Sequence, residues 1–161
     1  MSDRSHPEDR PNTIPWPPIL LVGFIAIGFA LGRLVPLGWP AGMWGDLLTG
    51  LGLFMIIVAL IIDVTAMRTM AAARTTILPH QRSDHLVTRG IFRFSRNPIY
   101  TANLMLIAGI GLFAGNVWLL LLAPLDGLAT QKLAIAREEA HLEARFGKTY
   151  RDYKKKVNRW I

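Results

Sequence analysis

Two polar segments of this 161-residue chain gather the side chains that could do chemistry, and both adjoin long apolar stretches. The first, residues 85–100, contains Asn97-Pro98, and proline is favoured at the first position of a helix with asparagine as its N-cap. A helix that starts there turns its positive dipole end toward the preceding loop, where a carboxylate or another anion is stabilised. The segment therefore predicts a helix start that can bind an anionic ligand.

The second polar segment, residues 137–153, places two acids side by side, Glu138 and Glu139. Adjacent helix residues point to different faces, so at most one of the two enters a given site. An acid there could accept a hydrogen bond from an amine or a ribose hydroxyl, or offset a cationic ligand. The alternative is a solvated helix whose acids pair with neighbours such as Arg145 in interfacial water, and the pattern alone favours this alternative.

Three long apolar stretches must position these segments, at residues 19–35, 47–67 and 99–125. A membrane-spanning helix needs about 20 apolar residues. The first two stretches fit single spans, and the second contains an acid inside the membrane, Asp63, which is a functional candidate by default. The third is long for one span, and Gly115-Asn116 in its middle is a turn signal. It can form one tilted helix or a hairpin of two short helices.

The distribution of charge decides between these two forms. The chain has 18 Lys and Arg against 11 Asp and Glu, a net charge of +7. Six cations lie between the second and third apolar stretches and nine lie at or beyond Lys132, whereas the turn at Gly115-Asn116 has none. Because Lys- and Arg-rich segments stay cytoplasmic, a hairpin of residues 99–114 and 117–130 keeps both basic segments on one side. The charge thus indicates membrane orientation rather than nucleic-acid binding.

These elements predict an all-α fold, a polytopic membrane bundle of about four spans with a short helical hairpin and a cytoplasmic C-terminal helix. We expect three regions: a cytoplasmic tail at 1–18, two transmembrane helices within 19–67, and a core at 68–161 that contains the hairpin 99–130. The C-terminal helix should run from about Lys132 to Tyr153, with Gly147 as its stop. The chain has no cysteine, which excludes disulfides and thiolate metal sites.

Three motifs in a fixed order carry a resemblance: Gly90-x-Phe92-x-x-x-Arg96-Asn97-Pro98-x-Tyr100, Glu138-Glu139, and Phe146-Gly147-x-x-Tyr150-x-x-Tyr153. Together they resemble the C-terminal signature of the isoprenylcysteine carboxyl methyltransferase and phospholipid methyltransferase superfamily, over about residues 75–161. The resemblance implies S-adenosylmethionine as cofactor, held on the cytoplasmic side outside any Rossmann fold. It places the cofactor-binding contacts at His85, Leu86, Val87, Phe92, Asn97, Pro98, Tyr100 and Glu138.

The resemblance also implies methyl transfer to a lipophilic acceptor, a small molecule or lipid that enters from the bilayer. A carboxylate acceptor needs no base, whereas an amine must first lose a proton, which could involve Glu139 or His141. Four residues before Glu138, where eukaryotic carboxyl methyltransferases use an arginine on the substrate, this chain has Ala134, and Arg137 could substitute for it. The alternatives are phospholipid or small-amine N-methylation and a non-catalytic membrane scaffold. We expect neither a metal nor a nucleic acid as partner.

The charge pattern predicts an integral protein of the bacterial inner membrane with both termini in the cytoplasm. A topology reporter fused after Ile161 should therefore read cytoplasmic, because the hairpin returns the C-terminal cations to the side of the central ones. A periplasmic reading would contradict the hairpin and the site that depends on it.

Overall fold

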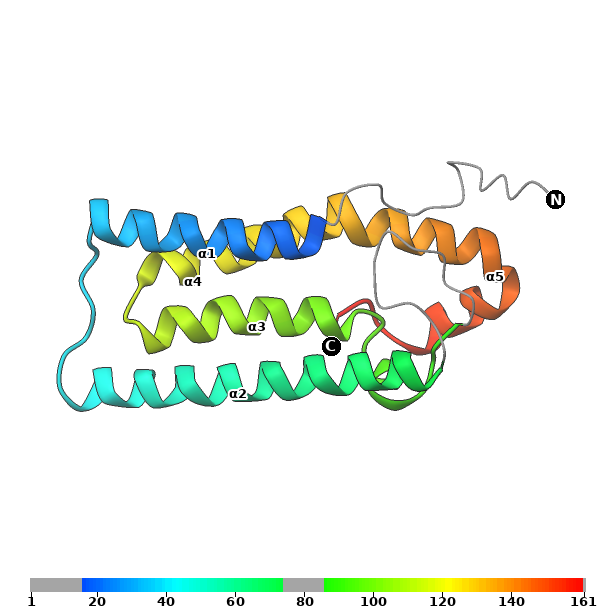
Figure 1. Ribbon diagram of the computed structural model, residues 1–161, viewed down its shortest axis with the longest axis horizontal. Coiled ribbons are helices and arrows are strands. Elements are labelled where there is room, and N and C mark those ends of the chain that lie inside the picture. Colours follow the sequence, from blue (N-terminus) through cyan, green and yellow to red (C-terminus); the bar gives the residue numbers. More distant parts are fainter. Residues whose placement is uncertain (1–15, 74–85, 161) are drawn as a thin grey trace.

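The computed structural model describes residues 16–73 and 86–160, and in these ranges all regular structure is helical (Figure 1). The helices are α1 (Trp16–Leu34), α2 (Met43–Ala72), α3 (Pro98–Phe113), α4 (Val117–Thr130) and α5 (Ala136–Lys156). A 3-10 turn, η2 (Gly90–Arg93), precedes α3, and a π-helical turn, η3 (Gln131–Ile135), joins α4 to α5 without a break. The predicted all-α helical bundle is confirmed.

The four helices α1 to α4 alternate in direction along the chain (Figure 1). Helix α3 packs against both α2 and α4, and α4 packs in turn against α1. The starts of α1 and α3 and the ends of α2 and α4 therefore lie at the same end of the bundle, which we call the polar end. Helix α5 extends beyond the polar end, and this is where the functional residues predicted from the sequence must meet.

Gly115 and Asn116 build the turn between α3 and α4, as the sequence predicted. Gly115 has a φ of 64°, a left-handed conformation that glycine adopts without steric cost. The side chain of Asn116 caps α4 by accepting hydrogen bonds from the backbone N–H groups of Trp118 and Leu119, at 3.0 and 3.4 Å. Its amide also donates to the carbonyl of Gly28 on α1 over 3.0 Å. One side chain thus closes the hairpin and attaches it to α1.

Two helix boundaries differ from those expected. Helix α1 begins at Trp16, inside the segment 1–18 that we assigned to the tail, because Pro17 and Pro18 fall in its first turn, where backbone N–H groups have no intrahelical partner. Helix α2 continues to Ala72, beyond the end expected at residue 67. This extension carries Met70 past the apolar stretch and toward the polar end.

Helix α5 has two halves that meet at Gly147, whose φ of 53° and ψ of −121° are not helical. The expected stop is therefore correct for the first half, but a second helical half follows and the chain turns back toward the bundle (Figure 1). Helix α5 ends before Val157, whose backbone is extended, and the chain returns to the start of α3, where the Arg96 N–H donates to the carbonyl of Asn158 over 3.0 Å. The two halves of α5 thus approach the polar end from different sides.

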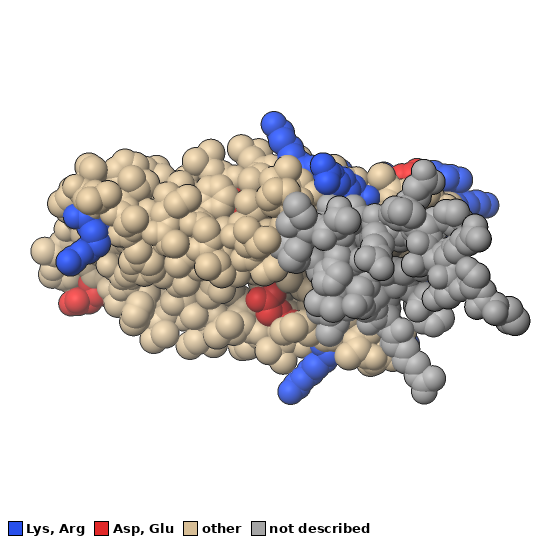
Figure 2. Space-filling model, turned by 45° about the horizontal axis from the view of Figure 1, so that its top comes forward, with Lys and Arg blue, Asp and Glu red and all other residues tan. Residues whose placement is uncertain are grey.

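Much of the bundle surface is apolar, and Figure 2 shows a wide uncharged area over it. Large hydrophobic side chains such as Val22, Leu47 and Phe54 are more than half exposed. Helices α1, α2 and the continuous helix from Val117 to Lys156 are long and apolar enough to cross a membrane. Helix α3 has 16 residues, about 24 Å, and is shorter than a hydrocarbon core of about 30 Å. It lies between α2 and α4.

Glycine permits a close contact between the backbones of α2 and α3. A Cβ added to Gly52 would lie 2.4 Å from the backbone nitrogen of Phe113 and 2.7 Å from the carbonyl oxygen of Gly109. Backbone atoms cannot move aside as a flexible side chain can, so the two helices can approach this closely only without a side chain at this position. Gly50, two residues earlier on the same helix, is exposed, and a Cβ there would meet nothing within 4 Å.

We expect Gly52→Ala to lower the free energy of unfolding by about 1–3 kcal/mol, because the added methyl group forces α2 and α3 apart. Gly50→Ala is the matched control and should leave stability unchanged or slightly raised, since alanine favours helix more than glycine does. Thermal unfolding of both variants in the same detergent measures the difference. Equal stability of the two variants would contradict the assigned α2–α3 contact.

Candidate functional site

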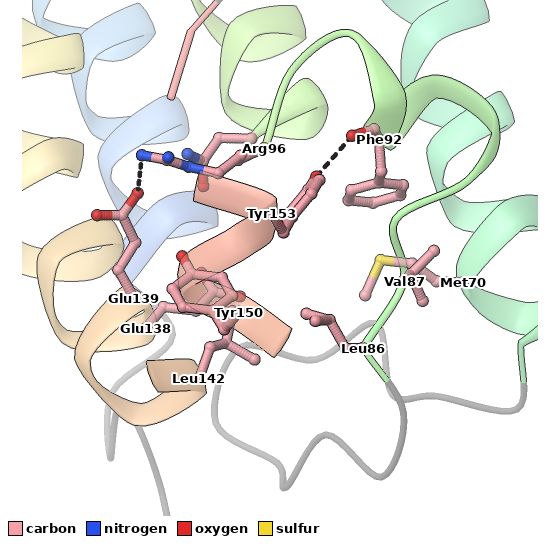
Figure 3. Close-up of a pocket in the computed structure, with 11 residues that line it drawn as sticks. Met70, Leu86, Val87, Phe92, Arg96, Glu138, Glu139, Leu142, Tyr150 and Tyr153 are labelled. Atoms are coloured by element: carbon pink, nitrogen blue, oxygen red, sulfur yellow. Dashed lines mark hydrogen bonds and ion pairs between the residues drawn. The ribbon is translucent and has the colours of Figure 1, made fainter. Parts of the chain in front are cut away.

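A pocket opens at the polar end between the segment that precedes α3 and the two halves of α5 (Figure 3). Its cavity volume is about 70 Å³, and the empty space rises to about 540 Å³ when the open mouth is included. The described residues that line it are Met70, Leu86, Val87, Phe92, Arg96, Asn97, Glu138, Glu139, Leu142, Tyr150 and Tyr153. The structure therefore brings five of the eight predicted cofactor-binding residues to one cavity.

The walls of this pocket differ in polarity. Met70, Leu86 and Val87 lie together on one side, and Glu138 and Tyr150 lie on the opposite side (Figure 3). A ligand with an apolar or aromatic part and a polar part would find a matching surface for each. The predicted contacts Leu86 and Val87 belong to the apolar wall and Glu138 to the polar wall.

Glu138 is held at the pocket by Tyr100, another predicted contact. The buried Tyr100 hydroxyl donates to Glu138 Oε2 over 2.9 Å, joining the start of α3 to α5. Burial raises the pKa of Glu138 and so does the adjacent charge of Glu139, whereas the hydrogen bond from Tyr100 acts in the opposite direction and is outweighed. Glu138 therefore takes up a proton more readily than an ordinary glutamate, and Tyr100 fixes one of its oxygens.

Glu139 lies next to Glu138 but has quite different surroundings. Its carboxylate accepts from Arg96 Nη2 over 2.8 Å, and from Arg159 Nε and Nη2 over 3.1 and 2.5 Å. Burial alone would raise its pKa, but the hydrogen bond from Arg159 and the positive charges of Arg96 and Arg159 together lower it. Glu139 is therefore ionised and fully engaged, which makes it a poor proton acceptor and a strong structural anchor.

Asn97 and Pro98 begin α3 as predicted, with Asn97 at the N-cap and Pro98 in the first turn. The Asn97 side chain does not cap the helix. Its amide instead donates to the carbonyl of Arg159 over 3.0 Å, and its backbone N–H donates to Ser95 Oγ over 3.1 Å. Asn97 thus lines the pocket while its amide nitrogen binds the returning C-terminal segment; Pro98 is buried beside it.

The second half of α5 closes the pocket with two buried tyrosines. Tyr153 donates from its hydroxyl to the carbonyl of Phe92 in η2 over 2.5 Å, and Tyr150 is 1% exposed. Burial raises the pKa of Tyr153 to about 12, so its hydroxyl keeps its proton at neutral pH. The turn at Gly147 makes this closure possible, because it directs residues 148–156 back toward η2.

Several predicted residues lie elsewhere. Arg137 is exposed on α5 and His141 is half-buried, and neither is among the described residues that line the pocket. His85 lies outside the described residues. The roles of Arg137 and His141 in catalysis and of His85 in cofactor binding stay predictions.

The sequence reasoning also missed residues that the structure brings to the site. Arg96 lies within the first motif, and its position as a cation directly before a helix start could have identified it as a candidate site residue. Met70 and Leu142 gave no signal, because single apolar residues on a helix are ordinary packing residues. Arg159 lies beyond all three motifs. The site thus contains more of the chain than its signature indicates.

Two acids lie inside the apolar helices. Asp63 on α2 is half-buried and Asp126 on α4 is 2% exposed, and in each one carboxylate oxygen is buried without a hydrogen-bond partner in the described part of the chain. We missed Asp126 because it follows directly after the charge-free stretch 99–125. Within residues 16–73 and 86–160, no cluster of acids and histidines suits a metal ion.

Comparison with known proteins places these residues in context. The family model described as phospholipid methyltransferase matches residues 47–149, from α2 to just beyond the turn in α5. An uncharacterized protein of Haemophilus influenzae is 38% identical over 63 residues, which are 39% of this chain and the whole of that protein. The family match contains all of the described pocket lining except Tyr150 and Tyr153.

We expect Glu139→Gln to lower the free energy of unfolding by about 3 kcal/mol, because it leaves Arg96 and Arg159 without their shared counter-charge. The matched control is Glu143→Gln on the same helix, whose partly exposed pair with Lys154 should contribute less than about 1 kcal/mol.

The two variants should also differ in pH dependence. The folded-state pKa of Glu139 lies below its ordinary value of 4.5, so its contribution is complete above that pH and is lost as the pH falls through the lower folded-state value. The difference between wild type and Glu139→Gln should therefore shrink in acid, as measured by denaturation in detergent from pH 7 to pH 3. Equal effects of the two substitutions at pH 7 would contradict the anchoring role.

Proposed function

This chain belongs to the phospholipid methyltransferase family of integral-membrane methyltransferases, and we propose that it transfers a methyl group from S-adenosylmethionine to a lipophilic acceptor. The resemblance identified from the sequence is confirmed by the family match. The observation that carries the proposal is the pocket at the polar end. There the predicted cofactor contacts Leu86, Val87, Phe92 and Asn97 line one cavity with Glu138, which is far from them in the sequence.

The residues of the pocket suit this cofactor. The apolar wall of Met70, Leu86 and Val87 can cover an adenine ring, and the Glu138 carboxylate can accept from an amine or a ribose hydroxyl. The Arg96 guanidinium would repel a sulfonium, but its charge is offset by Glu139 at 2.8 Å. The pocket therefore combines an apolar surface, an acceptor and a neutralised cation.

The protein's part in such a reaction is mainly to bind, orient and exclude water. Bound S-adenosylmethionine supplies an electrophilic methyl group on its sulfonium, and an in-line displacement needs the acceptor held behind that carbon. Tyr100 fixes Glu138, and Tyr150 and Tyr153 cover the pocket from the side of α5. These contacts hold Glu138 and the loop at Phe92 in place on two sides of the pocket.

The acceptor decides whether a base is needed. The family's description favours a phospholipid, and an amine headgroup would have to lose a proton before it attacks. Ala134, at the position where the carboxyl methyltransferases use an arginine on the substrate, is completely buried and carries no charge, which supports an amine over a carboxylate acceptor. Because its arginines lower the pKa of Glu139, we assign Glu139 a structural role and leave His141 as the candidate base.

The orientation of the protein follows from its charges. The polar end carries the cations that precede α3 and those of α5, so we propose that it faces the cytoplasm of a bacterial cell. S-adenosylmethionine would then enter from the cytosol, and the acceptor would enter laterally from the membrane.

We expect S-adenosylhomocysteine to stabilise the detergent-solubilised protein, by about 2.7 kcal/mol at 100 times its dissociation constant. Glu138→Gln should bind it about tenfold more weakly, a loss of about 1.4 kcal/mol, because the substitution removes the anionic acceptor but keeps the side-chain shape. Glu143→Gln, on the same helix but outside the described lining, is the control and should bind like wild type.

Calorimetric titration of the three proteins gives the dissociation constants, and thermal unfolding confirms that each is folded. No binding by folded wild type would overturn the proposal and favour the scaffold alternative. Unchanged binding by Glu138→Gln would remove Glu138 from the cofactor contacts.

A further inference from the structure

Residues 157–160, which we call the C-terminal strap, follow α5 and lie against the start of α3. The Arg96 N–H donates to the carbonyl of Asn158 over 3.0 Å. Ser95 Oγ and the Asn97 amide both donate to the carbonyl of Arg159, over 3.3 and 3.0 Å. The strap thus binds three consecutive residues of the loop that forms one wall of the pocket.

The strap also binds the helix on the other side of the pocket. Arg159 donates from Nε and Nη2 to the two oxygens of Glu139, a bidentate geometry that fixes orientation as well as distance. One residue further on, Trp160 Nε1 donates to Gln131 Oε1 of η3 over 3.2 Å. The strap therefore connects the α3 start with both η3 and α5.

These contacts lie behind the pocket wall. Asn97, Arg96 and Glu139 line the pocket, whereas no strap residue is among the described lining residues. The strap also lies beyond residue 149, where the family match ends. Its effect on a ligand must therefore pass through the residues it holds.

We propose that the C-terminal strap sets the shape of the cofactor pocket, and that Arg159 is a positioning residue that fixes Glu139 and Asn97 from behind. This inference rests on the proposed function in one respect, that the ligand of the pocket is the cofactor. Without the Arg159 guanidinium, Glu139 keeps Arg96 as its one charged partner among the described residues. Arg96 still donates to the carbonyls of Lys154 and Val157, but the two hydrogen bonds between the strap and Glu139 are lost.

The test compares Arg159→Gln with Arg159→Lys. Arg159→Gln should bind S-adenosylhomocysteine about tenfold more weakly than wild type, and amide hydrogen exchange at residues 95–100 should rise. Arg159→Lys should recover much of both losses, because an ammonium keeps the ion pair with Glu139 although it lacks the bidentate geometry. If the Arg159 side chain acted only by packing, Arg159→Lys would not recover the affinity or the low hydrogen exchange.

Two further variants complete the experiment. Lys155→Gln removes one positive charge from an exposed neighbouring side chain and should bind like wild type. Trp160→Phe keeps an aromatic side chain but removes the hydrogen bond to Gln131, and should raise exchange at residues 95–100 with about a threefold loss of affinity. This variant tests the strap without changing any charge, should Arg159→Gln fail to fold.

Each outcome is decisive. Wild-type affinity in folded Arg159→Gln and Trp160→Phe, or unchanged exchange at residues 95–100 in both, would overturn the proposal. A loss of affinity in Lys155→Gln equal to that in Arg159→Gln would also overturn it, since the loss would then reflect net charge alone. If wild type does not bind S-adenosylhomocysteine, the proposed function fails, and the exchange comparison still shows whether the strap fixes the pocket wall.

Discussion

The site depends on one carboxylate shared by two arginines. Glu139 joins α5 to Arg96 before α3, which is 43 residues away in the sequence, and to Arg159 in the strap that follows α5. The clustered apolar core lies elsewhere, around Ile107 and Leu119 within the bundle, so the parts beyond the polar end must be held in another way. A buried ion pair is costly to desolvate but fixes geometry, and it is strongly destabilising to break by removing one partner. The cluster therefore provides the order that a larger core would otherwise provide.

The bundle and the site are stabilised by different forces. Within the bundle, glycine lets α2 and α3 approach until backbone atoms touch at Gly52 and Gly109, which suits helices that gain little from hydrophobic burial in lipid. Beyond the polar end, hydrogen bonds to carbonyls and carboxylates take over, through Tyr100, Tyr153 and the C-terminal strap. The pocket lies between the closely packed helices and the hydrogen-bonded segments beyond the polar end. For this reason one of its walls is apolar and the other is polar.

Much of the fold could be predicted from the sequence because membrane helices impose strong constraints. Apolar length, the Gly115-Asn116 turn and the placement of cations were sufficient for the hairpin. The resemblance to the family assigned Leu86, Asn97 and Glu138 as cofactor contacts, and all three line the pocket. The reversal of α5 was only half predicted, because a glycine that ends a helix does not show whether another follows. Arg159 could not be predicted, since nothing in its surroundings in the sequence shows that the chain folds back onto α3.

The π-helical turn between α4 and α5 sets the rotational phase of both glutamates. If residues 131–135 were wound as an α-helix, everything after them would turn by roughly a quarter of a circle, and Glu138 would no longer face Tyr100. The wider turn accommodates one residue more than an α-helix of the same length would. A single-residue deletion within η3 could close the turn to α form and leave the glutamates on their present faces, whereas the same deletion between Ala136 and Glu138 would move them. We therefore expect a change of length to preserve the direction of both glutamates only within η3, which lies directly before them in the sequence.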